Sequence, residues 1–322
     1  MTINLFIEIL EQGLIFSILG FGVYVTYKVL GMADMTTDGS FVLGGTVFGS
    51  LVAYHHLHPL LAMAFALLGG AAAGLLTGFL HIKLKISSLL SGIIVMTALY
   101  SVNLRILRGP NLPLFRERTL FTIVQEGFTR IGLQTPYGKL VLLFLLVFGL
   151  KWVYDWFFNT KLGLLLRTVG DNPQLLAQLG ANQDHMKFVG LMIANALVSL
   201  SGALMAQHQR NADVNAGVGM LVIGLTTIII GLTLFRKRDG YWLRPTTMII
   251  IGAILYRTLQ AFTLLLGLPS GDFKLISMVF VVIALTISNE PWKERLRTKR
   301  KRLAGVREEG WRVKDSITQK SV

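Results

Sequence analysis

The 322-residue chain contains no cysteine. Disulfides, thiolate metal sites and a thiol nucleophile are therefore excluded. Charged residues are also scarce, at 15% of the chain, whereas hydrophobic residues make up 53% and the mean hydropathy is +0.60. Several apolar runs approach the roughly 20 residues that a helix needs to cross a bilayer core. We therefore expect an all-α protein, a polytopic bundle of transmembrane helices, because helices satisfy their own backbone hydrogen bonds in lipid.

No group of residues in the sequence is typical of a membrane enzyme. There is no phosphate-binding glycine loop followed by Lys and Ser or Thr, no nucleophile elbow and no zinc-protease helix motif. His55, His56 and His58 form a small cluster, but without a nearby carboxylate a solvated turn explains it better than a metal site. We predict that the chain is not an enzyme and has no catalytic residues, metal ligands or cofactor of its own.

The apolar runs predict about nine membrane spans, between eight and ten because the second run is short. The expected spans are 4–29, 41–54, 59–81, 86–106, 140–158, 188–207, 218–235, 246–266 and 273–287. Residues 1–290 would form one transmembrane domain. Residues 291–322 would form a tail with eleven Lys or Arg and four Asp or Glu. Such a tail is typical of the cytoplasmic face of a membrane, where it lies beside anionic lipid headgroups. Nucleic-acid binding explains the tail poorly, because no folded basic module accompanies it.

The distribution of positive charge predicts the orientation of the chain. If nine spans alternate, the basic tail falls on one side with three other basic stretches, at 83–85, 161–187 and 236–244. We assign that side to the cytoplasm and the amino terminus to the outside. The loop 107–138 counts against this assignment, because it would lie outside although it carries four arginines.

The polar stretch 161–187, between the fifth and sixth spans, contains the start and stop signals of a short helix at 171–180. Asp171 or Asn172 can cap its start, and Pro173 suits its first position. Gly180 suits the left-handed residue that ends a helix. The leucines that share one side by their spacing are Leu175, Leu176 and Leu179. Spacing alone leaves two interpretations open, a docking element on the aqueous face and an ordinary capped connector.

Polar side chains within the expected spans, or beside them, are candidates for a permeation path. They are Asp34, Asp38, Asn195, Gln207, Asp213 and Arg257. Hydrogen bonding between helices is the alternative. We favour it for Ser199 and Ser201, and both interpretations stay open for Asp34, Asp213 and Arg257.

A weak internal repeat links the two halves of the chain. Ala33-Asp34 and Ala212-Asp213 each follow one expected span and lead through polar residues and glycine into the next. The two halves would run in opposite senses, so we expect an inverted repeat. In transporters built this way the substrate path lies at the repeat interface. A further set of glycines would let helices pack closely: Gly69, Gly70, Gly74, Gly78, Gly190 and Gly202.

Four stretches, taken in order, resemble the permease subunits of ABC importers of the branched-chain amino acid, ribose and nucleoside type. The run RTVGDNP at 167–173 continues to Leu179-Gly180, and GMAD at 31–34 is followed by DGSFVLG at 38–44. The stretches 195–231 and 256–277 also match the pattern. The resemblance covers nearly the whole membrane region but not the basic tail. It is closest to the subgroup linked with uptake of tryptophan and related aromatic amino acids.

The resemblance implies a permease subunit in a bacterial cell membrane, pairing with a second subunit as a homodimer. A cytoplasmic ABC ATPase, which holds the ATP and Mg, and an extracytoplasmic substrate-binding protein would be its partners. Transmission to the ATPase would involve Gly170, Asp171, Asn172, Pro173, Leu175, Leu176, Leu179 and Gly180. An amino acid, tryptophan or another aromatic, is the first expectation for the substrate. The alternatives are a nucleoside or sugar ABC permease, an ATP-independent secondary transporter or channel, and a membrane anchor without transport.

Overall fold

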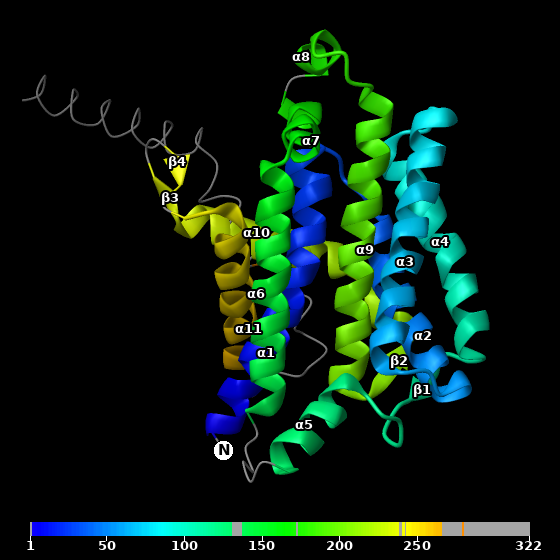
Figure 1. The fold of residues 1–322 in the computed structure, drawn as a ribbon, viewed down its shortest axis with the longest axis vertical. Helices are drawn as coiled ribbons and strands as arrows, with labels where there is room; N and C mark the ends of the chain where they lie inside the picture. The colour runs from blue at the N-terminus through cyan, green and yellow to red at the C-terminus, as the bar shows by residue number, and fades with distance from the viewer. Residues whose placement is uncertain are drawn as a thin grey trace, which may run out of the picture.

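The computed structural model describes residues 2–130, 137–171, 173–237, 240–241, 243–265 and 279 of the chain. These residues form a bundle of helices, most of which run along its long axis (Figure 1). The helices are α1 Thr2–Tyr24, α2 Thr36–His55, α3 Pro59–Gly78, α4 Ser88–Leu107, α5 Leu120–Arg130, α6 Gly138–Asn159, α7 Lys161–Asp171, α8 Pro173–Gln178, α9 Gln183–Gln209, α10 Met220–Leu234 and α11 Pro245–Leu265. The all-α membrane fold predicted from the sequence is confirmed.

Short irregular pieces sit at the ends of these helices. α1 and α3 end in π-helical turns, Val25–Val29 and Phe79–Lys83, and the 3₁₀ turn Val214–Gly217 precedes α10. The strands are β1 Asn111–Pro113, β2 Asn211–Asp213, β3 Arg236–Lys237 and β4 Gly240–Tyr241. β1 pairs antiparallel with β2, and β3 pairs antiparallel with β4.

Six stretches of the described residues are long and apolar enough to cross a membrane. They are Ile3–Val29, Pro59–Lys83, Ser88–Leu107, Gly138–Asn159, Gln183–Gln209 and Val214–Leu234. Each matches one of the predicted spans, and α2 and α11 lie where two more were expected. The ninth span, 273–287, and the basic tail lie outside the described residues, apart from Val279. The count of nine therefore stays a prediction.

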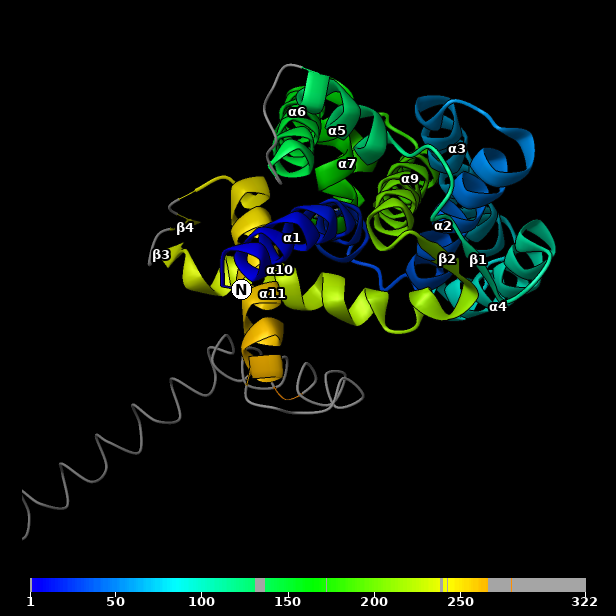
Figure 2. The same cartoon turned by 90° about the horizontal axis from the view of Figure 1, so that it is seen from below.

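α9 lies at the centre of the bundle, packed against α1, α2 and α3 (Figure 2). Glycines allow this packing, because a Cβ at Gly70 or Gly74 would collide with a backbone oxygen of α9. A Cβ at Gly202 would likewise collide with the backbone oxygen of Phe41 on α2. In lipid, such close backbone approach is a main source of helix association. The prediction of close packing is confirmed for these three glycines.

The structure corrects one predicted boundary and adds elements to two predicted connecting stretches. α2 begins at Thr36 rather than at residue 41, and Asp34 Oδ1 accepts a hydrogen bond from Thr36 N, the first N–H group of the helix. The expected loop 107–138 contains β1 and α5, and the stretch 161–187 contains α7 in addition to α8. α5 and α7 are both amphipathic and 11 residues long, so a search for apolar runs passes over them.

The connections gather at two ends of the bundle. The amino terminus, α5 and the β1–β2 pair lie at one end, and α7 and α8 lie at the other (Figure 1). β1 follows α4 and β2 follows α9, and Asn111 pairs with Asp213. This grouping agrees with the predicted alternation of the spans.

Candidate functional site

Asp34 lies almost fully buried in the coil between the end of α1 and the start of α2. Its Oδ1 accepts a hydrogen bond from Thr36 N at 2.9 Å, and its Oδ2 accepts one from Asn195 Nδ2 at 2.8 Å. Ser40 Oγ donates to Asn195 Oδ1 at 2.7 Å. A buried carboxylate without such partners would be costly. This network fixes the start of α2 to the middle of α9 and brings together two of the predicted path residues.

Asp38 lies in the first turn of α2 and caps a different helix. Its Oδ2 accepts a hydrogen bond from Gly219 N at 3.0 Å, and its Oδ1 accepts one from Leu221 N at 2.7 Å. The first N–H groups of a helix have no partner within the helix, so Asp38 satisfies two of these donors at the start of α10. The start of α2 is therefore joined to both α9 and α10.

Asp213 starts the 3₁₀ turn before α10. Its Oδ1 accepts a hydrogen bond from Asn215 N at 2.8 Å. Asp34 makes the same bond to the residue two positions on, and each aspartate follows an alanine. This local likeness is what the predicted inverted repeat requires, and the repeat itself stays a prediction.

A cavity of about 270 Å³ lies between α2, α4 and the 3₁₀ turn before α10. Val42, Met96, Tyr100 and Val218 give it an apolar lining, and Asp38 contributes to its wall. Asp38 is thus the predicted path residue that lines this cavity. Sequence reasoning missed Met96 and Tyr100, because apolar residues within an apolar span give no signal of their own.

Two predicted path residues lie elsewhere and connect helices. Gln207 Oε1 accepts a hydrogen bond from Leu120 N at 3.0 Å and so caps the start of α5. Arg257, on α11, donates to Gln260, and its Cζ lies 5.0 Å from the centroid of the Phe16 ring on α1. The Gln207–Leu120 bond and the Arg257–Phe16 contact each join two elements, which matches the alternative interpretation.

A buried pair that the sequence analysis did not single out joins α1 to α9. His208 Nδ1 lies 3.4 Å from Glu11 Oε2, and both side chains are less than a tenth exposed. Gln12 Nε2 lies 3.3 Å from His208 Nε2. The signal for this pair was a carboxylate inside the first apolar run.

α8 has the predicted start and stop residues. Pro173 is its first residue, and Gly180 has a φ of +71°, the left-handed conformation that favours glycine. Asp171 is the last residue of α7 rather than the residue directly before α8. Asn172 lies outside the described residues, so the predicted cap there is not described.

The three leucines of α8 and its end face in different directions. Leu176 is fully buried, whereas Leu175 and Leu179 are 42% and 59% exposed. Leu176 therefore anchors α8 to the bundle, and the two exposed leucines are available to another protein.

The end of α7 touches the point where α1 gives way to the coil before α2. A Cβ at Gly170 would collide with the backbone oxygen of Val29. On the other side, the side chain of Leu30 packs against Gly190 of α9. Gly31 follows with a φ of +67°. The segment Val29–Gly31 is therefore held between α7 and α9, and three residues after it Asp34 joins the start of α2 to α9.

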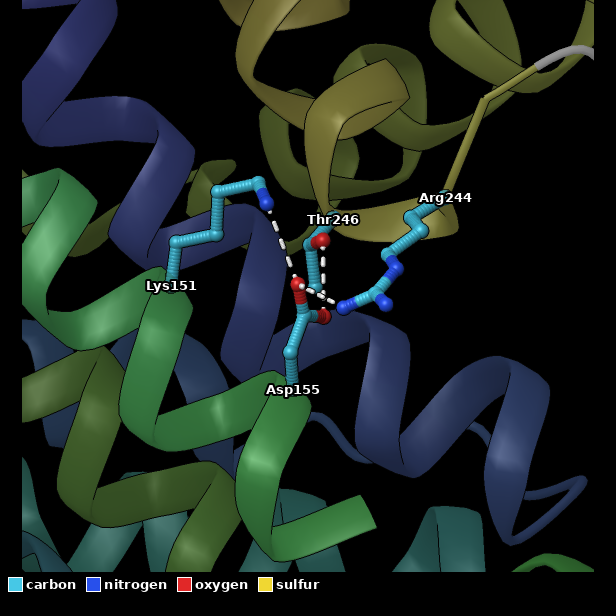
Figure 3. A network of polar contacts seen from close by, with 4 residues as sticks. All are labelled: Lys151, Asp155, Arg244 and Thr246. Carbon is cyan, nitrogen blue, oxygen red and sulfur yellow. Dashed lines mark hydrogen bonds and ion pairs between the residues drawn. The ribbon is translucent and has the colours of Figure 1, made fainter. Parts of the chain in front are cut away.

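A polar network ties α6 to the start of α11 (Figure 3). Asp155 of α6 accepts hydrogen bonds through both carboxylate oxygens. Its Oδ2 accepts from Lys151 Nζ at 3.0 Å and from Arg244 Nη1 at 3.4 Å. Its Oδ1 accepts from Thr246 Oγ1 at 2.9 Å. α6 leads directly into α7 and α8. The element that carries α8 is thus fixed at two points, to α11 and to the end of α1.

Known proteins resemble this chain over most of its length. The profile of the family described as branched-chain amino acid transport system / permease component matches residues 5–287. A tyrosine transport system permease protein of Clostridioides difficile strain R20291 is 44% identical over 283 residues, which cover 88% of this chain and 91% of that protein. The ribose import permease protein RbsC of Escherichia coli K12 is 24% identical over 291 residues, covering 90% of this chain and 87% of that protein.

A solved structure shares the fold. PsaBC from Streptococcus pneumoniae, in complex with Fab, superposes with a TM-score of 0.51 at 14% identity. The match covers 90% of this chain and 94% of the other.

Proposed function

Because the chain belongs to the family of permease components of branched-chain amino acid transport systems, we propose that it is the membrane-spanning subunit of an ATP-driven ABC importer. Two such subunits pair around the substrate path. A separate cytoplasmic ATPase binds and hydrolyses ATP with Mg, and an extracytoplasmic binding protein delivers the substrate. The chain itself binds no nucleotide in this proposal, in keeping with the lack of a phosphate-binding loop.

The observation that carries the proposal is α8 together with its supports. It projects from one end of the bundle with Leu175 and Leu179 exposed, while Leu176 anchors it. A secondary transporter or channel gives no reason for such an element. Transmission of motion from the ATPase also needs a rigid element, because a frayed helix would dissipate that motion. The contacts of Asp155 and Gly170 supply that rigidity.

Basic residues beyond the exposed tryptophans of α6 support placing this end in the cytoplasm. Trp152 and Trp156 are 72% and 63% exposed, near the end of α6 that leads into α7. Tryptophan is enriched at membrane interfaces, and Lys or Arg in cytoplasmic loops. Lys161 lies beyond the tryptophans at the start of α7, and Arg244 lies directly before α11.

An aromatic amino acid is the substrate that we propose. The support is the 44% identical relative, which is named for tyrosine transport, whereas the relative named for ribose is only 24% identical. The substrate class is tested by comparing two groups of competitors in ATP-dependent uptake. One group is tyrosine, tryptophan and phenylalanine, and the other is ribose and a nucleoside. Uptake inhibited by ribose or the nucleoside alone would transfer the proposal to those solutes.

The docking role is tested with the double variant Leu175→Ser/Leu179→Ser, co-expressed and purified with a candidate ABC ATPase subunit. The variant removes the two exposed apolar side chains and keeps the buried anchor Leu176. We expect the ATPase to co-purify with the wild type and to be lost from the variant, because apolar anchors dominate such contacts.

The matched control is Leu162→Ser/Leu164→Ser on α7, where both leucines are 53% exposed. It changes the same surface chemistry in the neighbouring helix, so the ATPase should still bind. Equal loss from both variants would contradict docking through α8. Absence of any ATPase from the wild type would favour the secondary transporter or channel.

A further inference from the structure

The cavity between α2, α4 and the 3₁₀ turn Val214–Gly217 is small and mostly apolar. Its volume of about 270 Å³ is bounded by Val42, Met96, Tyr100 and Val218, among others. Drug-sized ligands occupy pockets of about 300–1,000 Å³. The cavity therefore suits a small solute, or the apolar part of one.

Several of the polar groups in the cavity wall already have partners within the chain. Both carboxylate oxygens of Asp38 accept backbone N–H groups at the start of α10. Thr97 Oγ1 donates to Ile93 O at 2.8 Å, and Asn103 Oδ1 accepts from Thr46 Oγ1 at 3.0 Å. A sugar would have to leave some of its buried hydroxyl groups without partners here, at a cost for each. An aromatic or aliphatic side chain would not.

The position of the cavity distinguishes it from a crevice for lipid. It lies where two helices start within the bundle, α2 after the Asp34 coil and α10 after the 3₁₀ turn. In transporters built from inverted repeats, substrate sites form beside such interrupted helices. A lipid chain would gain nothing from two helix starts and a carboxylate in the wall.

We propose that this cavity receives the aromatic side chain of the amino acid substrate during passage. The proposal deepens the importer function and rests on it. The Tyr100 ring and the Met96 thioether supply the contacts that aromatic rings favour. Val42 and Val218 add apolar surface beside the ring. Tyr100 and Met96 therefore determine specificity in this proposal.

The lack of cysteine provides a direct test, because a single introduced thiol has no background. Thr97→Cys places a thiol in the cavity wall, and Ile94→Cys places one on α4 outside the set of lining residues. Both detergent-solubilised variants are labelled with a charged thiol reagent, with and without L-tyrosine, L-tryptophan or ribose. At ten times its dissociation constant, an aromatic amino acid should slow labelling of Thr97→Cys about tenfold.

Ribose should leave the labelling rate of Thr97→Cys unchanged, and no solute should change that of Ile94→Cys. A Thr97→Cys thiol that does not react with the reagent would overturn the proposal, since a lipid-filled crevice excludes a charged reagent. Equal protection by ribose, or none by any aromatic amino acid, would overturn it as well. Failure of the proposed importer function would give a different result from failure of the cavity proposal, because the wild type would then show no ATP-dependent uptake.

A kinetic comparison does not depend on the introduced thiol. Tyr100→Ala should raise the KM for aromatic amino acid uptake about tenfold, because one ring contact is lost. Ile94→Ala on the same helix should leave it near the wild-type value. An unchanged KM for Tyr100→Ala, with uptake intact, would also overturn the proposal.

Discussion

The side chain of Asn195 has a different task from the other polar residues of α9. Ser201 Oγ donates a single bond to Ile15 O at 2.9 Å, and Ser199 Oγ donates a single bond to Ala66 O at 2.6 Å. Asn195 instead holds a buried carboxylate and a buried hydroxyl from the start of α2. Sequence reasoning identified all three residues as polar groups in a span, and it could not distinguish these tasks because spacing does not reveal the partner.

Asn195→Leu should therefore destabilise the bundle by about 2–3 kcal/mol, because it leaves the buried Asp34 carboxylate without its amide donor. Ser201→Ala removes one hydroxyl and should cost about 1 kcal/mol or less. Thermal unfolding of both purified variants in detergent measures the difference. Equal midpoints for the two variants would contradict a special role for the Asp34–Asn195 bond.

At the scale of elements, the segment Val29–Gly31 links α8 to the start of α2. Gly170 of α7 packs against the backbone of Val29, and the segment then continues into the coil that contains Asp34. Interfaces of this kind switch between discrete packings rather than deform continuously. A displacement of α8 would reach Asp34 and Asp38 by this route, and through Asp38 the start of α10.

Gly170→Ala should separate ATP hydrolysis from uptake, because the added Cβ would collide with Val29 O and push α7 away from α1. Gly149→Ala on α6 is the matched control, since nothing lies within 4 Å of a Cβ there. Both variants are reconstituted with the ATPase and assayed for hydrolysis and transport. We expect Gly170→Ala to hydrolyse ATP with transport reduced about tenfold or more. Transport at the Gly149→Ala rate would reject this route.

The elements could be predicted from the sequence to the extent that apolar length reveals them. Eight predicted spans correspond to helices, and the boundaries of α6 and α11 differ from prediction by two residues or fewer. α5 and α7 were missed because amphipathic helices lack a continuous apolar run. The start of α2 was missed because its first turn is polar and because the bond from Thr36 N to Asp34 cannot be read from an apolar run. The cavity was missed because it depends on how α2, α4 and the 3₁₀ turn meet.

At the scale of the whole molecule, the two ends of the bundle differ in what they offer. The end with α8 presents exposed leucines on a helix that the contacts of α6 and α7 hold in place. It lies beyond the exposed tryptophans of α6. The opposite end presents α5, whose start is held by Gln207, and the β1–β2 pair. An importer needs two such unlike faces, one for the ATPase and one for the binding protein.

The orientation can be measured with single cysteines in this cysteine-free chain. Gln178→Cys is exposed on α8, and Phe115→Cys replaces a side chain that is 72% exposed between β1 and α5. We expect an impermeant maleimide to label Phe115→Cys in intact cells and Gln178→Cys only after permeabilisation, because positive charge in short loops favours the cytoplasm. The reverse pattern would place α8 outside, where ATP is absent, and would contradict ATP-driven import through this element.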